Sequence, residues 1–279
     1  NADIGPLAIN DGHHYEELRE WDNHAGKWIY DEEAWSYMHS AAALGHTAAI
    51  QVLIEAKASI NVESFEGETP LCYACLGGQE HPRLAIDRLE RRRTDKSFFR
   101  TNKPARFHIA NLNAPSRPLP HRYIAAARAL LDAKATIPAK EDSDTPLHLA
   151  IECGQTAVAK LLIDANANVS VKNTDFKTPL HLASFHNDVT IVQALLRAKA
   201  DVNVQGRYQR TPLHDAACCH PKISQILIGA KATVDVRDSS DETPLFHAIN
   251  CNNSAVVQVL VNAKAHVNVP VRADPRFLT

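Results

Sequence analysis

The stretch TPLHLAIECGQTAVAKLLIDANANVSVKN occupies residues 145–173, and its opening returns as TPLHLA at residues 178–183 and as TPLHDA at residues 211–216. Aligned on this opening, successive units are separated by 33, 76, 33, 33 and 32 residues. The units begin at Ser36, Thr69, Thr145, Thr178, Thr211 and Thr243. A recurring period of about 33 residues predicts a solenoid of stacked units rather than one globular core.

Each unit predicts two short helices. Thr145 can cap the first helix with its hydroxyl group, and Pro146 suits the first helical position, where no backbone N–H is needed. Residues 147–150 supply an apolar stripe, Gly154 interrupts the pattern, and residues 158–162 resume it at helical spacing. A single unit cannot bury its apolar face alone, so stability must come from stacking.

The TPLHLA motif, the Gly interruption, the Leu-Leu pair and the Asp-Val-Asn tail together resemble the ankyrin repeat family over about residues 31–279. This resemblance implies an all-α repeat solenoid of stacked helix pairs with projecting β-hairpin fingers. It also implies a protein that binds other proteins and is not an enzyme. The expected divisions are a capping segment at 1–35, repeats at 36–68, 69–144, 145–177, 178–210, 211–242 and 243–275, and the start of a further repeat at 276–279.

The chain departs from the family where each second helix ends, because a residue other than Gly occupies the usual Gly position. These residues are Lys57, Lys134, Asn166, Lys199, Lys231 and Lys264. A left-handed backbone at this position costs a non-Gly residue about 1 kcal/mol. A lysine near a helix C-terminus recovers part of that cost through the helix dipole.

The N-terminal segment lies outside the repeat pattern. Residues 15–21 (YEELREW) predict a helix, and Trp21, Trp28 and Trp35 could cover the apolar end of the stack as a cap.

The long interval at residues 79–122 is strongly basic, with 11 Lys and Arg residues against 4 Asp and Glu residues. Its candidate basic patch consists of Arg91, Arg92, Arg93, Lys96, Arg100 and Lys103. The interval can be an insertion between the two helices of the second repeat, or a degenerate extra repeat followed by a long loop. Its charges can be solvated, can receive an acidic protein, or can contact RNA or an anionic lipid. Nucleic acid and lipid are the less favoured partners, because the aromatic residues nearby can serve packing alone.

The resemblance implies that a partner binds at the finger tips and at the ends of the first helices. The expected partner-binding residues are Asp175, Phe176, Lys177, Phe185, His186, Arg207, Tyr208, Arg210, Cys218 and Cys219. Aromatic residues and Arg are enriched at interface centres. We expect a peptide or helical segment of another protein with an apolar anchor near Phe176 and Tyr208 and a carboxylate near Arg207 or Arg210. The alternative is an ordinary solvated surface.

Recurring His and Cys residues raise the question of metal binding or catalysis. His39, His148, His181 and His214 occupy one position of four repeats. Packed helices lie about 8–10 Å apart, whereas a zinc–nitrogen bond is about 2 Å long, so these residues are expected to be structural. The Cys72/Cys75 pair is expected in the core, and Cys218-Cys219-His220 lacks an orienting group and an oxyanion hole. No catalytic residue, cofactor or metal site is therefore expected.

Three asparagines resemble the substrates of asparaginyl β-hydroxylases on ankyrin hairpins. Asn61, Asn203 and Asn268 each follow Val or Ile and lie eight residues after a Leu. They are candidate hydroxylation sites.

Net charge, the length of apolar runs and cysteine usage limit the classes of function and the compartments that are expected. The net charge of −2 does not favour nucleic acid or a membrane surface, and no apolar run approaches the length of a transmembrane helix. Six cysteines are too few and too regularly placed for a disulfide scaffold, so they favour a reducing, cytoplasmic compartment, with the nucleus or a host cytosol as variants. The leading hypothesis is an adaptor or targeting scaffold. The rival is the substrate-recruiting part of a larger enzyme or secreted microbial effector whose catalytic domain lies outside this chain.

Overall fold

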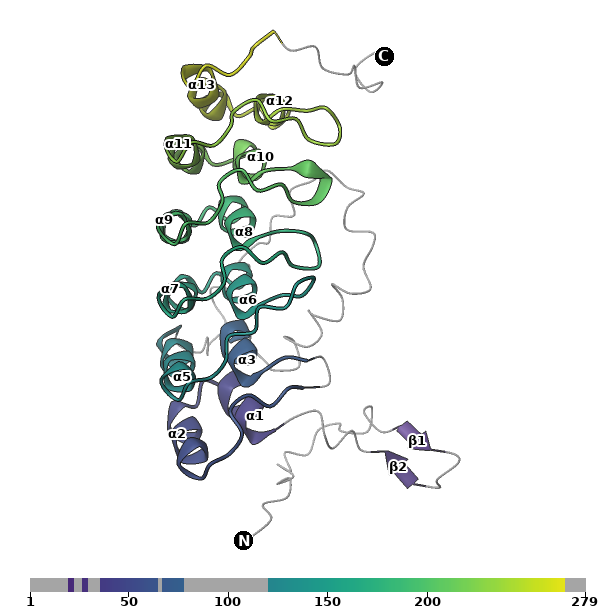
Figure 1. The fold of residues 1–279 in the computed structure, drawn as a ribbon, viewed down its shortest axis with the longest axis vertical. Coiled ribbons are helices and arrows are strands. Elements are labelled where there is room, and N and C mark those ends of the chain that lie inside the picture. Colours follow the sequence, from purple (N-terminus) through teal and green to yellow (C-terminus); the bar gives the residue numbers. More distant parts are fainter. Residues whose placement is uncertain (1–19, 23–26, 30–35, 65–66, 78–119, 269–279) are drawn as a thin grey trace, which may run out of the picture.

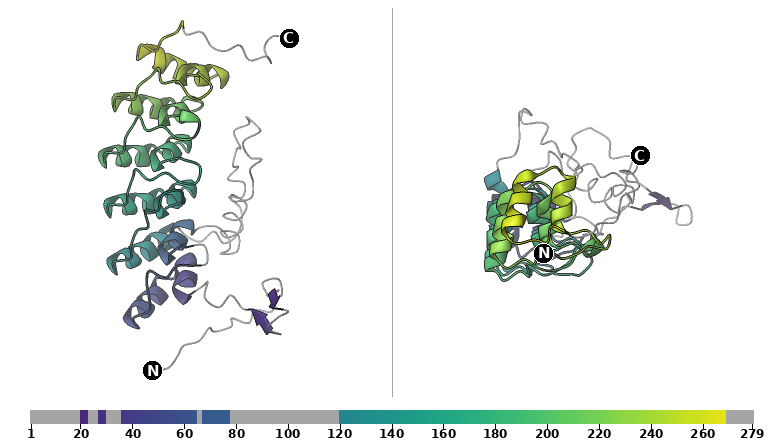
Figure 2. Two further views of the ribbon diagram at one scale, coloured as in Figure 1. Left: turned by 45° about the vertical axis from the view of Figure 1, so that its right-hand side comes forward. Right: turned by 90° about the horizontal axis from the view of Figure 1, so that it is seen from above.

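A computed structural model describes residues 20–22, 27–29, 36–64, 67–77 and 120–268. Its helices form two parallel columns along the long axis of the molecule (Figure 1). The inner column contains α1 (Tyr37–Ala43), α3 (Pro70–Leu76), α6 (Pro146–Glu152), α8 (Pro179–Phe185), α10 (Pro212–Ala217) and α12 (Pro244–Asn250). The outer column contains α2 (Thr47–Glu55), α5 (Pro120–Asp132), α7 (Thr156–Asp164), α9 (Val189–Arg197), α11 (Pro221–Gly229) and α13 (Ser254–Asn262). The predicted all-α repeat solenoid is confirmed, and Figure 2 shows each helix pair lying on the one before it.

The Thr-Pro-Leu-His motif begins the inner helices through a reciprocal cap. The Thr145 hydroxyl group accepts from the backbone N–H of His148, and the His148 ring accepts from the backbone N–H of Thr145 at 3.2 Å. Pro146 occupies the first turn, where its missing donor costs nothing. The same cap begins α8 at Thr178 and α10 at Thr211. These helices of six or seven residues therefore have fixed starting points although they are short.

Small residues let neighbouring inner helices approach one another. Four alanines at equivalent positions are fully buried, namely Ala150, Ala183, Ala216 and Ala248. The preceding leucines Leu147, Leu180 and Leu213 are also fully buried, and each contributes about 2 kcal/mol by leaving water. The core is one apolar layer that continues from repeat to repeat.

The outer helices end as the sequence predicts, in left-handed backbone. Residues Lys57, Lys134, Asn166, Lys199, Lys231 and Lys264 all have φ between 60° and 70°. The prediction of a left-handed cap built from non-Gly residues is confirmed. The chain thus carries a small conformational cost at the end of every outer helix.

Replacing one of these lysines with glycine should stabilise the fold. We expect Lys199→Gly to raise the free energy of unfolding by about 0.5 kcal/mol, because glycine adopts positive φ without steric cost while the helix dipole loses one favourable charge. Urea denaturation measures the change. The control is Lys160→Gly inside α7, which should cost about 1 kcal/mol. A loss of stability at both positions would contradict the assignment of strain to Lys199.

The basic interval joins the two helices of one repeat. Helix α5 packs against α3, α2 and α7, while α3 packs directly against α6 of the next repeat. This packing favours an insertion over a degenerate extra repeat, and α5 begins at Pro120, inside the 79–122 stretch. The six residues of the candidate basic patch lie outside the described residues.

Loops project from the inner column on the side away from the outer helices (Figure 1). We define the third finger as residues 173–177, the fourth as 206–210 and the fifth as 238–242. Each is closed by one backbone hydrogen bond from its first residue to its last, of 2.9, 2.7 and 2.9 Å respectively. The expected β-hairpins are corrected to hairpin-shaped turns, since residues 36–64, 67–77 and 120–268 contain no strand. Five residues closed by one hydrogen bond are too short for a ladder.

The N-terminal prediction of a helix over 15–21 is wrong at its end. Strand β1 (Glu20–Asp22) pairs antiparallel with β2 (Lys27–Ile29), with Trp21 opposite Trp28. The intervening Asn-His-Ala-Gly sequence contains turn-forming residues that compete with a helix. The rest of the proposed cap at 1–35 and the proposed repeat start at 276–279 lie outside the described residues.

Among the described residues, every helix is too short or too polar to serve as a membrane span. The longest, α5, has 13 residues, against the roughly 20 that a bilayer requires.

Candidate functional site

Two aromatic side chains stand exposed on neighbouring fingers. Phe176 of the third finger is 53% exposed and Tyr208 of the fourth is 48% exposed. Their φ angles are 59° and 58°. Positive φ is an outlier for a bulky residue and costs on the order of 1–2 kcal/mol. The fold therefore holds two half-exposed rings in a backbone conformation that glycine would adopt more easily.

Removing the Phe176 ring should stabilise the protein. Phe176→Gly relieves the positive φ and exposes little new apolar surface, so we expect a gain of about 1 kcal/mol in urea denaturation. The control is Phe185→Ala, which removes an exposed aromatic ring from helical backbone and should give no gain. If Phe176→Gly were destabilising, the ring would be a packing residue.

The Tyr208 tip is fixed by contacts to the fingers on both sides. Arg207 Nη1 lies 3.3 Å from Asp175 Oδ1 of the third finger, and its guanidinium lies 5.2 Å from the Tyr208 ring centre. The backbone N–H of Ser239, in the fifth finger, donates to the Tyr208 carbonyl at 2.8 Å. The three fingers thus form one connected surface.

Close approach of the third and fourth fingers explains Gly206. A Cβ atom at this position would lie 2.9 Å from the Phe176 carbonyl oxygen and 3.0 Å from His181 Nε2. That nitrogen donates to the Arg210 carbonyl at 3.0 Å. Only glycine lets the backbones of the two fingers come this close.

Asp238, the first residue of the fifth finger, links that finger to the fourth. Its carboxylate is fully buried and accepts from Arg210 Nε at 3.1 Å and His247 Nε2 at 3.0 Å. It also accepts from the backbone N–H groups of Ser240 and Glu242 at 2.9 and 3.1 Å. Burial alone would raise the pKa of Asp238, but these hydrogen bonds outweigh burial and leave the pKa below its usual value. Asp238 is therefore ionised and held in place.

Sequence reasoning missed Asp238. A signal was available, because Asn173 occupies the same finger position and accepts from the N–H groups of Asp175 and Lys177 at 3.1 and 3.0 Å. The Arg210 pairing was also missed. Sequence reasoning offered that guanidinium to a partner, whereas the structure places it on a carboxylate of this chain.

One group of potential metal ligands occurs among the described residues. The ligand atoms of Asp238, Glu242 and His247 lie within 4.8 Å of one another. Arg210 and His247 already bond the Asp238 carboxylate, so the protein itself compensates its charge.

The ends of the inner helices extend the finger surface. Phe185 is 44% exposed at the end of α8, with Lys177 Nζ 5.1 Å above its ring and His186 packed edge-on at 5.4 Å. Cys218 is half-buried and Cys219 exposed just after α10. The structure therefore brings Lys177, Phe185 and His186 together.

The cysteines singled out by their position in the sequence are poor candidates for a nucleophile. Burial raises the pKa of both Cys218 and Cys219. Cys72 and Cys75 lie in the core, as expected, and burial raises the pKa of Cys72 to about 12. These groups are neutral thiols near pH 7 and are poorly suited to nucleophilic catalysis.

Both ring nitrogens of each recurring His take part in hydrogen bonds. Nδ1 lies at the cap of its own repeat, and Nε2 donates to a carbonyl group at the end of the following finger. The acceptor carbonyls are those of Glu68 for His39 (3.1 Å), Lys177 for His148 (3.0 Å), Arg210 for His181 (3.0 Å) and Glu242 for His214 (3.3 Å). These residues fasten each finger to the preceding helix, which is a structural role.

Two of the candidate hydroxylation sites hold the next repeat. Asn61 Oδ1 accepts from the N–H of Thr136 at 2.9 Å, and Asn203 Oδ1 accepts from the N–H of Thr233 at 2.8 Å. Asn268 is exposed after the last described helix. Hydroxylation at these three positions stays a prediction.

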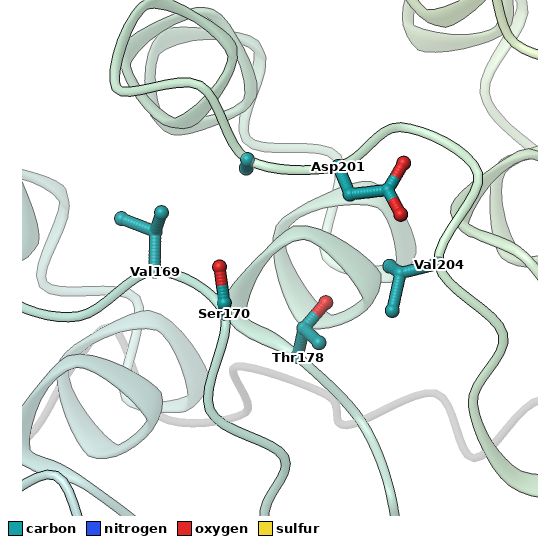
Figure 3. A pocket seen from close by; sticks show the side chains of 6 residues that line it. Val169, Ser170, Thr178, Asp201 and Val204 are labelled. Carbon is teal, nitrogen blue, oxygen red and sulfur yellow. The ribbon is translucent and has the colours of Figure 1, made fainter.

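A small pocket lies between the third and fourth repeats (Figure 3). It is lined by Val169, Ser170, Thr178, Ala200, Asp201 and Val204. Its volume of about 20 Å³ accommodates little more than one water molecule. The connected surface of exposed side chains on the fingers is thus a better candidate site than this pocket.

Comparison with known families supports the repeat architecture. A family model described as ankyrin repeats (3 copies) matches residues 121–206 and 180–271, which together span more than half of the chain. A comparison with curated proteins finds no match.

Proposed function

The chain belongs to the ankyrin repeat family, whose repeats are protein–protein interaction modules, and from that premise we propose that it binds a partner protein through the finger surface. The finger surface is defined as Asp175, Phe176, Lys177, Phe185, His186, Arg207, Tyr208, Arg210, Cys218 and Cys219. The proposed role is that of an adaptor or targeting scaffold.

One observation carries this proposal: Phe176 and Tyr208 are half-exposed rings at positive φ. Positive φ also occurs where the outer helices end, but Phe176 and Tyr208 combine it with a large exposed ring, and backbone strain is common at binding sites. Half-exposed rings gain little from burial within the chain. Burial of the two rings against a partner would offset the free-energy cost of their strained backbone.

The surface favours a peptide or helix with an apolar anchor and a carboxylate. The anchor would pack between Phe176 and Tyr208. A carboxylate would compete with Asp175 for Arg207, whose pair with Asp175 is partly exposed and therefore weak. Arg210 is a positioning residue in this scheme, because the buried Asp238 holds it.

Affinity capture from a cell lysate tests the proposal. The chain and two double variants are compared by quantitative mass spectrometry. Phe176→Ala/Tyr208→Ala removes the two rings. Val52→Ala/Gln193→Ala changes exposed side chains of the outer helices α2 and α9 and is the matched control. A third variant replaces residues 79–119 with a short linker.

We expect one set of captured proteins to disappear with the ring variant and to persist with the other two. Capture that survives loss of both rings but requires residues 79–119 would refute the proposal, and would assign binding to the basic interval. Its salt dependence would then separate a nucleic acid or anionic lipid from a protein partner.

A further inference from the structure

The helix pair of the sixth repeat, α12 and α13, ends both columns of the described stack (Figure 1). One side of this pair packs on the fifth repeat, through contacts of α12 with α10 and of α13 with α11. Within residues 36–64, 67–77 and 120–268, no further helix pair stacks on the opposite side. We call that side the end face, and its apolar residues are Ile249, Val257, Val261 and Val267.

Ile249 of α12 occupies a repeat position that is covered in every earlier repeat. Its side chain is 57% exposed. The equivalent residues of the five earlier repeats are at most 3% exposed, namely Ala42, Cys75, Ile151, Ser184 and Ala217. Because the position is buried in each repeat that has a successor, the following repeat provides the cover.

Helix α13 and the segment after it show the same loss of cover. Val257 is only partly buried, whereas its equivalents are fully buried, namely Ile50, Ala127, Ala159, Val192 and Ser224. Val261 and Val267 are 40% and 61% exposed. Their equivalents in the fifth repeat, Ile228 and Val234, pack against the core. The end face is thus the surface by which each earlier repeat binds the next one.

The composition of the sixth repeat is that of an interface rather than of a cap. A terminal repeat needs a polar outer face to keep a solenoid soluble. Residues 244–263, which include both helices, contain no Lys, Arg, Asp or Glu. The outer helices α2, α5, α7, α9 and α11 each contain at least one charged residue. Apolar surface without charge is characteristic of interface cores.

From these observations we propose that a second copy of this chain covers the end face, so that two chains meet tail to tail about a two-fold axis. A two-fold contact places the same patch of each chain against the other. Apolar side chains then meet apolar side chains, and residues 244–263 bring no like charges together. The contact continues the helix-on-helix packing that already joins the repeats. A charged partner surface would find no counter-charge on these residues.

The tail-to-tail contact is separate from the finger surface. That surface belongs to the third to fifth repeats, whereas the end face belongs to the sixth. A dimer would therefore carry two accessible finger surfaces and could bind two partner segments at once. The inference does not depend on the proposed partner, and either can fail without the other.

Sedimentation velocity of the purified chain, from about 1 to about 100 µM, tests the inference. We expect the measured mass to rise toward twice that of one chain. Ile249→Lys/Val261→Lys should weaken the dimer by at least about 100-fold, because two apolar side chains lose their burial and like charges meet. Both residues lie in the last turn of a helix, where lysine is favourable, so this variant should fold.

The matched control makes the same change of charge at the other end of the stack. Leu44 and Val52 of the first repeat are 40% and 64% exposed. Leu44→Lys/Val52→Lys should leave the dimer unchanged. Urea denaturation of both variants shows whether each is folded.

Three results would overturn the inference. One is a wild-type chain that stays monomeric over the whole concentration range, which would leave the end face to another segment or to a different protein. Another is a dimer that persists unchanged in Ile249→Lys/Val261→Lys. The third is a dimer that Leu44→Lys/Val52→Lys also abolishes, which would indicate head-to-tail association. The wild-type measurement can overturn the inference even if a variant fails to fold.

Discussion

Acidification from about pH 7.5 to about pH 5 should remove several kcal/mol of folding stability, long before carboxylates protonate. The cause is the set of four buried histidines that fasten the fingers, His39, His148, His181 and His214. Burial lowers the pKa of each below 6.5, and lowers that of His214 to about 4.

The direction follows from proton binding. Between the folded and unfolded pKa values, the unfolded chain binds more protons than the folded chain, so stability falls as the pH falls. Each histidine contributes up to about 1.4 kcal/mol per pH unit. For His214 the loss begins near pH 6.5, accumulates down to about pH 4 and reaches about 3 kcal/mol. The lowered pKa of Asp238 acts in the same direction, but only below the ordinary aspartate range.

Urea denaturation over this pH range measures the effect. His181→Gln should be less stable at neutral pH and should show a shallower pH dependence, because one buried titrating group is gone. The exposed His46→Gln is the control and should retain the wild-type slope. Equal stability at both ends of the range would mean that these rings are not held neutral.

Asp238→Ala should destabilise the protein by about 2–4 kcal/mol, the second large effect that we expect. The substitution leaves the N–H groups of Ser240 and Glu242 and the Nε2 atom of His247 without their acceptor, and it removes the counter-charge of Arg210. A buried carboxylate with four donors has no apolar replacement that satisfies them.

Asp238→Asn separates the contribution of the backbone hydrogen bonds in the fifth finger from that of the carboxylate charge. Asparagine performs the finger role in this chain already, at Asn173, so the amide oxygen should keep both backbone bonds. We expect about half the loss seen with alanine. Urea denaturation measures the change in unfolding free energy for each variant. Amide hydrogen exchange at Ser240 and Glu242 shows whether the two backbone hydrogen bonds are lost. If both variants cost the same, the charge pair rather than the turn dominates.

The features that depend on residues within one repeat could be predicted from the sequence. The period aligned the lysines that end the outer helices, and the family resemblance placed Phe176 and Tyr208 among the expected partner-binding residues. The ion pair between Asp238 and Arg210 joins side chains of two different repeats. Aligning the repeats with one another does not show which side chains of neighbouring repeats meet. The N-terminal strand was missed because local helix propensity competed with pairing to residues beyond a turn.

The strained backbone at Phe176 links the stability of the fold to the proposed binding function. Phe176→Gly should make the protein more stable and, on the present account, less able to bind. A gain in stability with a loss of binding is the expected signature of a residue kept for its surface.

Site-specific photo-crosslinking tests the central claim most directly. A photoreactive phenylalanine analogue is placed at position 176 on the third finger, and in a second protein at position 160 on the outer face of α7. The account predicts a crosslinked partner protein from position 176, competed away by unlabelled chain but not by Phe176→Ala/Tyr208→Ala, and none from position 160. Adducts from position 160 alone, or adducts from position 176 that the ring variant competes equally well, would contradict it.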